Sequence, residues 1–361
     1  MEQQDTFDRR ATNVCKGIAI CIMIYYHAFG ASDLTTFQQV FPVLFRVLGP
    51  YGNVCVPFFV ILTGYGLGLQ YLHSPTPYPQ MIGKRLLRLY QSYWPVFLIG
   101  FVAAPFLSRG KMDWTIAFGG DGLLQAIQRF LLNLLGLSHY AYGDGVYTLN
   151  QTWWYMSLAL FLILFLPLLC WLWKQWKWGG LLFVTAAAML LPDLRYLAYF
   201  PAAMLGVCLA GCNGFQALHR MGKGVLGLLI RILAVLAILA AWYKLRQHGI
   251  YPVLADSFAA WGICQFSFDV IGRIPVIHTV LAFLGKHSAN LFYLHSFVYC
   301  YWISTADFVF QFHYDLLIWA VILLLTLALS LTLEWLKRVI HYHAIMSNLE
   351  HRLLSQLQNA K

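Results

Sequence analysis

Charged residues are scarce in this chain. Asp, Glu, Lys and Arg make up 11% of the 361 residues, whereas about a quarter of a typical soluble domain is charged. Hydrophobic residues account for 60%, and the mean hydropathy is +0.65. This composition excludes a soluble globular protein and predicts an all-α integral membrane protein.

Other common features are absent as well. The eight cysteines include no CxxC pair and are scattered through apolar segments, so we interpret them as packing residues. Cys208 and Cys212 share a helix face, but no histidine pair accompanies them, so we predict no metal site. The sequence also lacks internal repeats, low-complexity tracts and a signal-peptide cleavage pattern. The first apolar run is therefore expected to remain as a membrane anchor.

What the sequence does contain is a series of apolar runs. Several approach the roughly 20 residues that cross a hydrocarbon core, and together they predict about ten transmembrane helices. The runs cover residues 17–29, 54–72, 93–107, 153–173, 180–191, 196–212, 224–242, 253–271, 289–303 and 316–336.

The net charge of +10 follows the positive-inside rule, and we predict no nucleic-acid partner. If the spans alternate from a cytoplasmic N-terminus, most Lys and Arg residues fall in the cytoplasmic segments. Both termini are therefore expected in the cytoplasm. Arg231 falls within a span, where it either snorkels toward the interface or faces the bundle interior.

The chain is expected to form one membrane domain, residues 1–340, and a polar, helical cytoplasmic tail, residues 341–361. The longest non-spanning region is the outer loop 108–152. Its stretch GLLQAIQRFLLNLLGL has helical apolar spacing and is either a re-entrant segment that shapes a site or a simple interfacial helix. Trp and Tyr residues at 140–155 fit an aromatic belt equally well.

The first span contains two ionisable residues, Lys16 and His27. Ionisable groups inside a membrane are costly and usually functional. Eleven helical residues make about three turns, so both side chains point the same way, roughly 16 Å apart along the axis. A neutral imidazole is a suitable general base near neutral pH. Lys16 is expected one turn into the helix on the cytoplasmic side, where it suits an anionic ligand or a lipid headgroup. The alternative is that Lys16 snorkels as a positive-inside anchor and His27 lies at the opposite boundary.

A basic cluster follows at Lys84, Arg85 and Arg88, on the cytoplasmic side of the third span. Arginine side chains suit phosphate groups because their planar donors pair with phosphate oxygens. The positive-inside rule alone also explains this cluster.

Two further segments carry recognisable patterns. In VPFFVILTGYGLGL, Thr63 with Gly64, Gly66 and Gly68 offers a small-residue surface for close helix packing, which we interpret as architectural, and Pro57 is expected to bend the helix. In HSANLFYLHSF, Ser288 resembles an N-cap and His295 is a second intramembrane histidine, which a packing role would also explain. Polar residues also lie on the expected outer rim and are interpreted mainly as solvated: Asp33, Asp144, Asp307, His313 and Asp315.

In this order and spacing, the segments resemble the membrane-bound acyltransferase 3 family, which O-acylates bacterial surface glycans. The family's first helix has a basic residue, ten intervening residues and a histidine, matched here by Lys16 and His27. FFVILTGY resembles the family's FFxxSGY, with Thr63 where serine is usual. KRLLRLYQSYW and SANLFYLH resemble two later motifs. TWWYMSLALFLILFLP resembles a WxxxxE segment, but the glutamate is absent, which sets this chain apart from the branch of the best-known enzymes.

The resemblance implies a reaction and a set of site residues. Acyl-CoA, most commonly acetyl-CoA, is expected to bind from the cytoplasm as donor substrate, with no permanently bound cofactor. Lys16, Lys84, Arg85 and Arg88 would bind the donor, and His27 would act as general base or carry the acyl group. The acceptor is expected to be a hydroxyl of a polysaccharide or lipid-linked sugar. The residues expected to line the pocket are Tyr26, Thr63, Tyr65, Trp154 and His295.

Two other functions explain part of the same pattern. A transporter or flippase of glycan precursors would also have about ten spans and an intramembrane histidine, although such proteins often contain internal repeats. A structural subunit of an envelope-synthesis complex would tolerate replacement of Lys16 and His27. In each case the expected location is the bacterial cytoplasmic membrane, among membrane lipids and envelope-biosynthesis partners.

Overall fold

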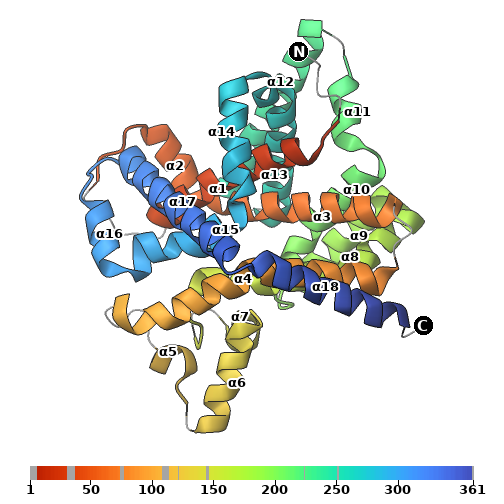
Figure 1. Ribbon diagram of the computed structural model, residues 1–361. Coiled ribbons are helices and arrows are strands. Elements are labelled where there is room, and N and C mark those ends of the chain that lie inside the picture. Colours follow the sequence, from red (N-terminus) through yellow and green to blue (C-terminus); the bar gives the residue numbers. More distant parts are fainter. Residues whose placement is uncertain are drawn as a thin grey trace. The chain divides into compact units, whose positions relative to one another are not determined.

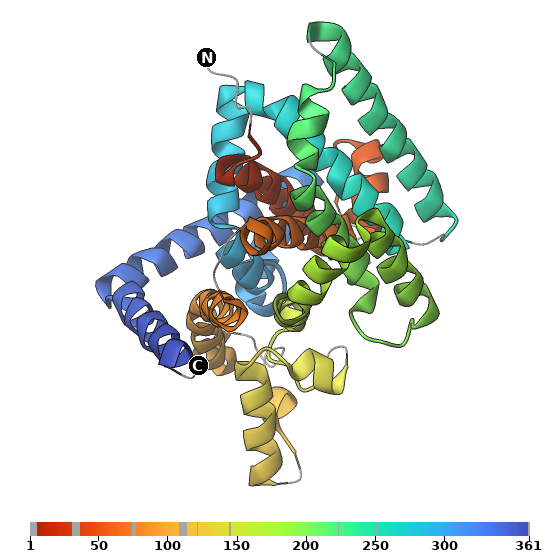
Figure 2. The same ribbon diagram turned by 90° about the vertical axis from the view of Figure 1, so that its right-hand side faces the viewer.

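The computed structural model is helical almost throughout (Figures 1 and 2). Each of the ten apolar runs lies on one or more helices, because a chain in an apolar environment must satisfy its backbone hydrogen bonds internally. The structure describes residues 6–30, 37–73, 77–107, 114–120, 122–143, 146–222, 224–249 and 252–359.

Four helical stretches among these residues are long and apolar enough to cross a membrane: Pro42–His73, Gln151–Trp176, Gly224–Gln247 and Asp315–Val339. A fifth arises if Leu197–Gly211 and Gly214–Arg220, which meet at a bend of 61°, form one broken span. The structure thus supports a helical membrane protein, while the count of ten spans and the cytoplasmic termini stay predictions.

The chain divides into two compact units, which we describe separately. Unit 1 comprises Met1–Ser32, Phe41–Pro75 and Phe165–Ser288, and unit 2 comprises Asp33–Val40, Thr76–Leu164 and Ala289–Lys361. The helices of unit 1 are α1 (Arg9–Phe29), α2 (Pro42–Tyr51), η1 (Gly52–Val54), α3 (Cys55–His73), α9 (Trp178–Leu190), η3 (Leu197–Tyr199), α10 (Phe200–Gly211), α11 (Gly214–Arg220), α12 (Gly224–Gln247), α13 (Pro252–Asp269), η4 (Ile271–Arg273) and α14 (Pro275–Lys286).

Unit 2 contains two long helices, α4 of 30 residues and α17 of 25 residues, and several shorter ones. Helix α8 begins in unit 2 and ends in unit 1. The helices of unit 2 are α4 (Tyr78–Leu107), α5 (Trp114–Phe118), α6 (Leu123–Leu134), α7 (Ser138–Tyr142), η2 (Gln151–Trp153), α8 (Trp154–Trp176), α15 (Ser288–Ser296), η5 (Phe297–Tyr301), α16 (Ile303–Phe310), α17 (Asp315–Val339) and α18 (Tyr342–Asn359).

Glycines let two helix pairs of unit 1 pack closely. A Cβ atom on Gly64 of α3 would lie 2.2 Å from the Ala203 carbonyl oxygen of α10, and one on Gly206 would lie 2.3 Å from the Ile61 oxygen. This confirms the small-residue packing surface expected around Thr63. Gly66 is not part of it, because a Cβ there would meet no atom within 4 Å.

Helices α1 and α14 cross in the same way (Figure 1). A Cβ atom on Gly17 would lie 2.2 Å from the Leu281 oxygen, and one on Gly285 would lie 1.8 Å from the Asn13 oxygen. Glycine is required at both points because the backbones touch. The crossing fixes α1 one residue beyond Lys16.

The core of unit 2 is aromatic. Tyr93 and Phe97 of α4 pack with Trp153, Tyr293 and Phe297, all of them nearly inaccessible. The ring of Tyr93 meets that of Trp153 edge-on at 5.3 Å, a geometry that the ring quadrupoles favour.

One asparagine connects the outer-loop region to this core. The stretch GLLQAIQRFLLNLLGL is helical as predicted, forming α6 and the turn after it. The Asn133 amide donates to the Tyr147 oxygen at 2.8 Å and accepts from the Leu149 nitrogen at 2.9 Å. Tyr93 donates its hydroxyl proton to the Asn133 carbonyl at 2.6 Å. This buried residue therefore holds the residues before η2 against α4 and α6.

Candidate functional site

Helix α1 places Lys16 and His27 on one continuous scaffold. Asp8 caps its N-terminus by accepting from the Ala11 nitrogen at 2.8 Å, and the helix runs for 21 residues without a break. The predicted geometry of about three turns between the two side chains therefore applies. Lys16 lies almost two turns from the start of the helix, not one turn as the sequence suggested, because α1 begins at Arg9.

The side chains of Lys16 and His27 are half-buried, whereas the helix face between them is fully buried. Ile20 and Met23 share that face and are 0% and 2% exposed. Lys16 and His27 are thus the two accessible ends of an otherwise buried stripe.

The surroundings of His27 are tightly packed. The neighbouring Tyr26 ring lies 5.4 Å from the imidazole. Tyr26 is itself confined by two glycines. A Cβ atom added to Gly52 would lie 2.6 Å from the Tyr26 Cβ atom, and one added to Gly30 would lie 2.7 Å from the Tyr26 ring. Tyr26 is therefore held beside the imidazole by two glycine contacts, which suits its predicted place in the pocket.

A buried charged group lies beyond η1, which the sequence did not reveal. Trp242 donates to the Asp256 carboxylate at 2.6 Å, and the Arg246 guanidinium lies 3.5 Å from the same oxygen. Arg246 also donates to the Asn53 side chain at 2.8 Å. Because Asn53 follows Gly52, η1 links this ion pair to Tyr26 and the end of α1.

The two pocket residues predicted on α3 occupy different surroundings. Thr63 is half-buried next to the glycine contact of α3 with α10. Tyr65 is 1% exposed, packs edge-on against Phe7 at 5.3 Å and accepts a hydrogen bond from Gln216 at 3.4 Å. Its position is that of a packed core tyrosine. Pro57 lies in the first turn of α3, where proline is tolerated, so the bend expected there is not needed.

In unit 2, the basic cluster lies on the first half of α4. Lys84 is 3.0 Å from the Glu350 carboxylate of α18, and the Arg88 guanidinium is 3.9 Å from it. Burial, together with the nearby charge of Arg88, lowers the pKa of the Arg85 guanidinium below its ordinary value. Three cations and one carboxylate thus share this face, and the cluster keeps a net positive charge that suits an anionic ligand.

The predicted donor clamp combines Lys16 of unit 1 with Arg85 and Arg88 of unit 2, so this combination stays a prediction. Within its own unit, each part has the expected residue types: one half-buried lysine on α1, and two arginines three residues apart on α4.

The two pocket residues predicted in unit 2 lie near a polar network. His295 is fully buried; its Nδ1 atom is 2.7 Å from the Phe292 oxygen, and its ring stacks on that of Tyr299 at 5.6 Å. The next residue, Ser296, accepts from the Asn150 amide at 2.8 Å. Trp154 is half-buried.

Trp153, the neighbour of Trp154, is the deeply packed tryptophan of this segment, and its indole nitrogen donates to the Tyr293 oxygen at 3.1 Å. The sequence analysis did not single out Trp153, Asn150 or Ser296. The run NQTWW contained the signal, since Asn150 caps η2 by accepting from the Thr152 nitrogen at 3.0 Å.

Arg231 faces the bundle interior, which decides between the two alternatives. It donates to Asp269 at 3.1 Å, and the other Asp269 oxygen lies 2.5 Å from the His219 ring. It also donates to the carbonyl oxygens of Met221 and Gly222. This network ties α12 to α13, to α11 and to the two residues that follow α11.

The outer-rim residues do not form one group. Asp33 and Asp144 lie outside the described residues. Asp307 and His313 are exposed. The interpretation of Asp315 as a solvated loop charge is wrong. This first residue of α17 is fully buried, because its carboxylate accepts from the Val40 nitrogen at 2.9 Å and its own backbone nitrogen donates to the Gln38 oxygen at 3.0 Å.

Comparison with known proteins identifies the chain's relatives at the family level. A family model described as "Acyltransferase domain" matches residues 9–335, nearly the whole chain. No curated protein and no solved structure matches this chain. The matched region includes both His27 and the basic cluster on α4.

Proposed function

The chain belongs to the acyltransferase 3 family and is a membrane acyltransferase, and we propose that it transfers an acyl group from acyl-CoA to a sugar hydroxyl. The acyl group is most simply acetyl, because acetyl-CoA is the common donor of the family. The acceptor is a surface polysaccharide or a lipid-linked sugar, and the location is the bacterial cytoplasmic membrane. The observation that carries this proposal is the continuous helix α1, with a cation almost two turns from its start and an imidazole in its last turn.

The chemistry assigned to His27 is general-base catalysis. The acceptor hydroxyl oxygen attacks the thioester carbonyl carbon while the imidazole takes the hydroxyl proton. The tetrahedral oxyanion then collapses, the carbon–sulfur bond breaks, and the proton passes from the imidazolium to the departing thiolate. The products are the sugar ester and free coenzyme A, and the histidine is restored.

The basic residues are assigned to donor binding. Coenzyme A carries a diphosphate and a separate phosphate monoester, which suit the arginine pair and Lys84 on α4. Lys16 is the fourth donor-binding residue. Its half-buried position on the same stripe as His27 is compatible with a donor whose anionic head lies near Lys16 and whose thioester lies about three turns further along α1, near His27.

The decisive experiment replaces the imidazole. His27→Ala should remove acyl transfer, with a loss of at least about 100-fold, because general-base catalysis typically contributes that much. Acyl-ester content is measured by NMR on extracted polysaccharide, and coenzyme A release is measured on purified protein. His248→Ala is the matched control, since His248 is exposed. Unchanged acylation in a well-folded His27→Ala protein would refute the assignment.

The flippase alternative gives a different result in the same assay. A flippase offered labelled acetyl-CoA should neither bind it nor release coenzyme A. The family match argues against this alternative because it describes an acyltransferase domain.

A further inference from the structure

The C-terminal helix α18 lies along the half of α4 that carries the basic cluster (Figures 1 and 2). His343, near the start of α18, lies 3.0 Å from the Gln91 side chain, and Glu350, two turns later, lies 3.0 Å from Lys84. Rising numbers on one helix face falling numbers on the other, so the two helices run antiparallel.

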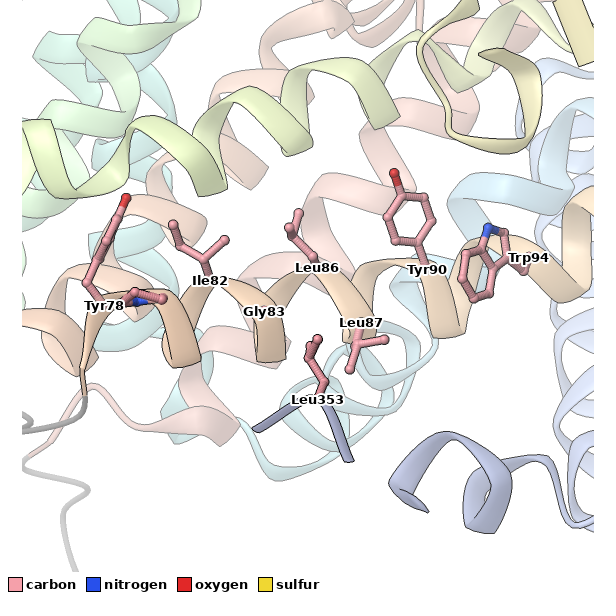
Figure 3. Close-up of a pocket in the computed structure, with 9 residues that line it drawn as sticks. Tyr78, Ile82, Gly83, Leu86, Leu87, Tyr90, Trp94 and Leu353 are labelled. Atoms are coloured by element: carbon pink, nitrogen blue, oxygen red, sulfur yellow. The ribbon is translucent and has the colours of Figure 1, made fainter. Parts of the chain in front are cut away.

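One face of α18 makes these contacts. His343, Met346, Glu350 and Leu353 recur at helical spacing. Met346 is 5% exposed. Leu353 borders an apolar groove of about 510 Å³ on α4, beside Leu86 and Leu87 (Figure 3). Apolar contacts at Met346 and Leu353 thus hold the helix in place on either side of Glu350.

The ion pairs of Glu350 with Lys84 and Arg88, which lie between these two apolar contacts, are weak enough for a ligand anion to replace the carboxylate. The side chains of Lys84 and Glu350 are 36% and 21% exposed, and Arg88 is more exposed still. Exposed ion pairs contribute little to stability because water solvates and screens both partners. Glu350 is also the one acidic residue of the sequence Tyr342–Asn359. A carboxylate thus lies where the cluster would meet a ligand phosphate.

We propose that α18 is an autoinhibitory strap whose Glu350 occupies the phosphate position at Lys84 and Arg88 until the donor displaces it. The inference rests on the proposed function, because it takes this cluster as the donor's phosphate site. A carboxylate and a phosphate compete there: both need the same cations, and they repel each other at short range. Coenzyme A carries several negative charges against one on Glu350, so the donor wins at sufficient concentration.

The test measures binding of coenzyme A to the purified full-length protein in lipid nanodiscs. Glu350→Gln keeps the size of the side chain and removes its charge. It should lower the dissociation constant by roughly two- to tenfold, the effect expected of losing one competing charge near the surface. Asp193→Asn is the control, since it removes one charge from an exposed loop and should leave the dissociation constant unchanged.

Three results are distinguishable. Tighter binding by Glu350→Gln alone supports the strap. Equal or weaker binding by Glu350→Gln, with normal binding by the wild type, overturns the strap and leaves the proposed function intact. If neither the wild type nor either variant binds coenzyme A, the donor assignment itself fails, and the strap fails with it.

A measurement on the unmodified protein provides an independent check. If the donor displaces Glu350, adding coenzyme A should increase amide hydrogen exchange in α18 and leave α17 unchanged. Increased protection of α18 would instead mean that this helix forms part of the donor site, which overturns the inference.

Discussion

At the scale of single residues, backbone contact decides which glycines matter. Gly64 and Gly66 are two residues apart on α3, yet a Cβ atom at the first would strike the Ala203 carbonyl oxygen, and one at the second would meet nothing. The first two glycines of the pattern GYGLG therefore differ: Gly64 is structural and Gly66 is replaceable. Sequence analysis grouped them because both are small.

This difference gives a matched pair of substitutions. Gly64→Ala should lower the free energy of unfolding by about 1–3 kcal/mol, because α3 and α10 must move apart. Gly66→Ala should be neutral or stabilising by up to about 1 kcal/mol, because alanine favours a helix more than glycine does. Thermal unfolding of the two purified variants checks this. Equal destabilisation would show that α3 and α10 do not touch at Gly64.

At the scale of elements, α6 is the helix with the most exposed apolar face in the outer-loop region. Leu123 and Leu124 are 78% and 80% exposed, and Ile127 and Leu131 continue the same face. The opposite side is fixed by Asn133. A helix with one apolar side left uncovered and one side anchored suits the membrane interface.

Lipid contact of α6 can be tested directly. A photo-crosslinking residue, p-benzoylphenylalanine, in place of Leu124 should label lipid when the protein is irradiated in a bilayer. The same residue in place of Gln125, which lies about 100° further round the helix, should label lipid much less. Mass spectrometry of the adducts measures the ratio. Equal labelling at both positions would contradict an interfacial orientation.

The elements were largely predictable from the sequence, and their contacts were not. Apolar runs located the helices because each run must satisfy its own backbone hydrogen bonds in lipid. Lys16 and His27 were placed on one face because helical geometry is local. The contact of Glu350 with Lys84 joins residues far apart in the chain, and the ion pair of Arg246 with Asp256 joins the end of α12 to α13. Periodicity contains no information on such pairings.

At the scale of the whole molecule, the number of spans determines whether the two termini lie on the same side of the membrane or on opposite sides. An even number leaves both termini on the same side, as the distribution of Lys and Arg predicts. Five spans, the upper count of helices long and apolar enough in the described residues, would leave them on opposite sides. The shorter or more charged helices therefore decide the topology.

Reporter fusions distinguish the two topologies. We expect a fluorescent protein fused to either terminus to fluoresce, and alkaline phosphatase fused to either terminus to be inactive, since both ends are predicted to be cytoplasmic. An active phosphatase at one terminus would indicate an odd number of spans. A phosphatase inserted at 120 provides the positive control, because the loop 108–152 is predicted to lie outside.

The turn η5 makes one place in the chain sensitive to its exact length. In this π-helical turn the Trp302 nitrogen donates to the Phe297 oxygen, five residues back, at 2.9 Å. The Gln151 backbone nitrogen donates a hydrogen bond to the Tyr301 hydroxyl oxygen at 2.9 Å. Removing one residue here would restore the α-helical register and rotate Tyr301 by about 100°. Relatives that keep this contact should therefore differ by substitution within the turn and not by insertion or deletion.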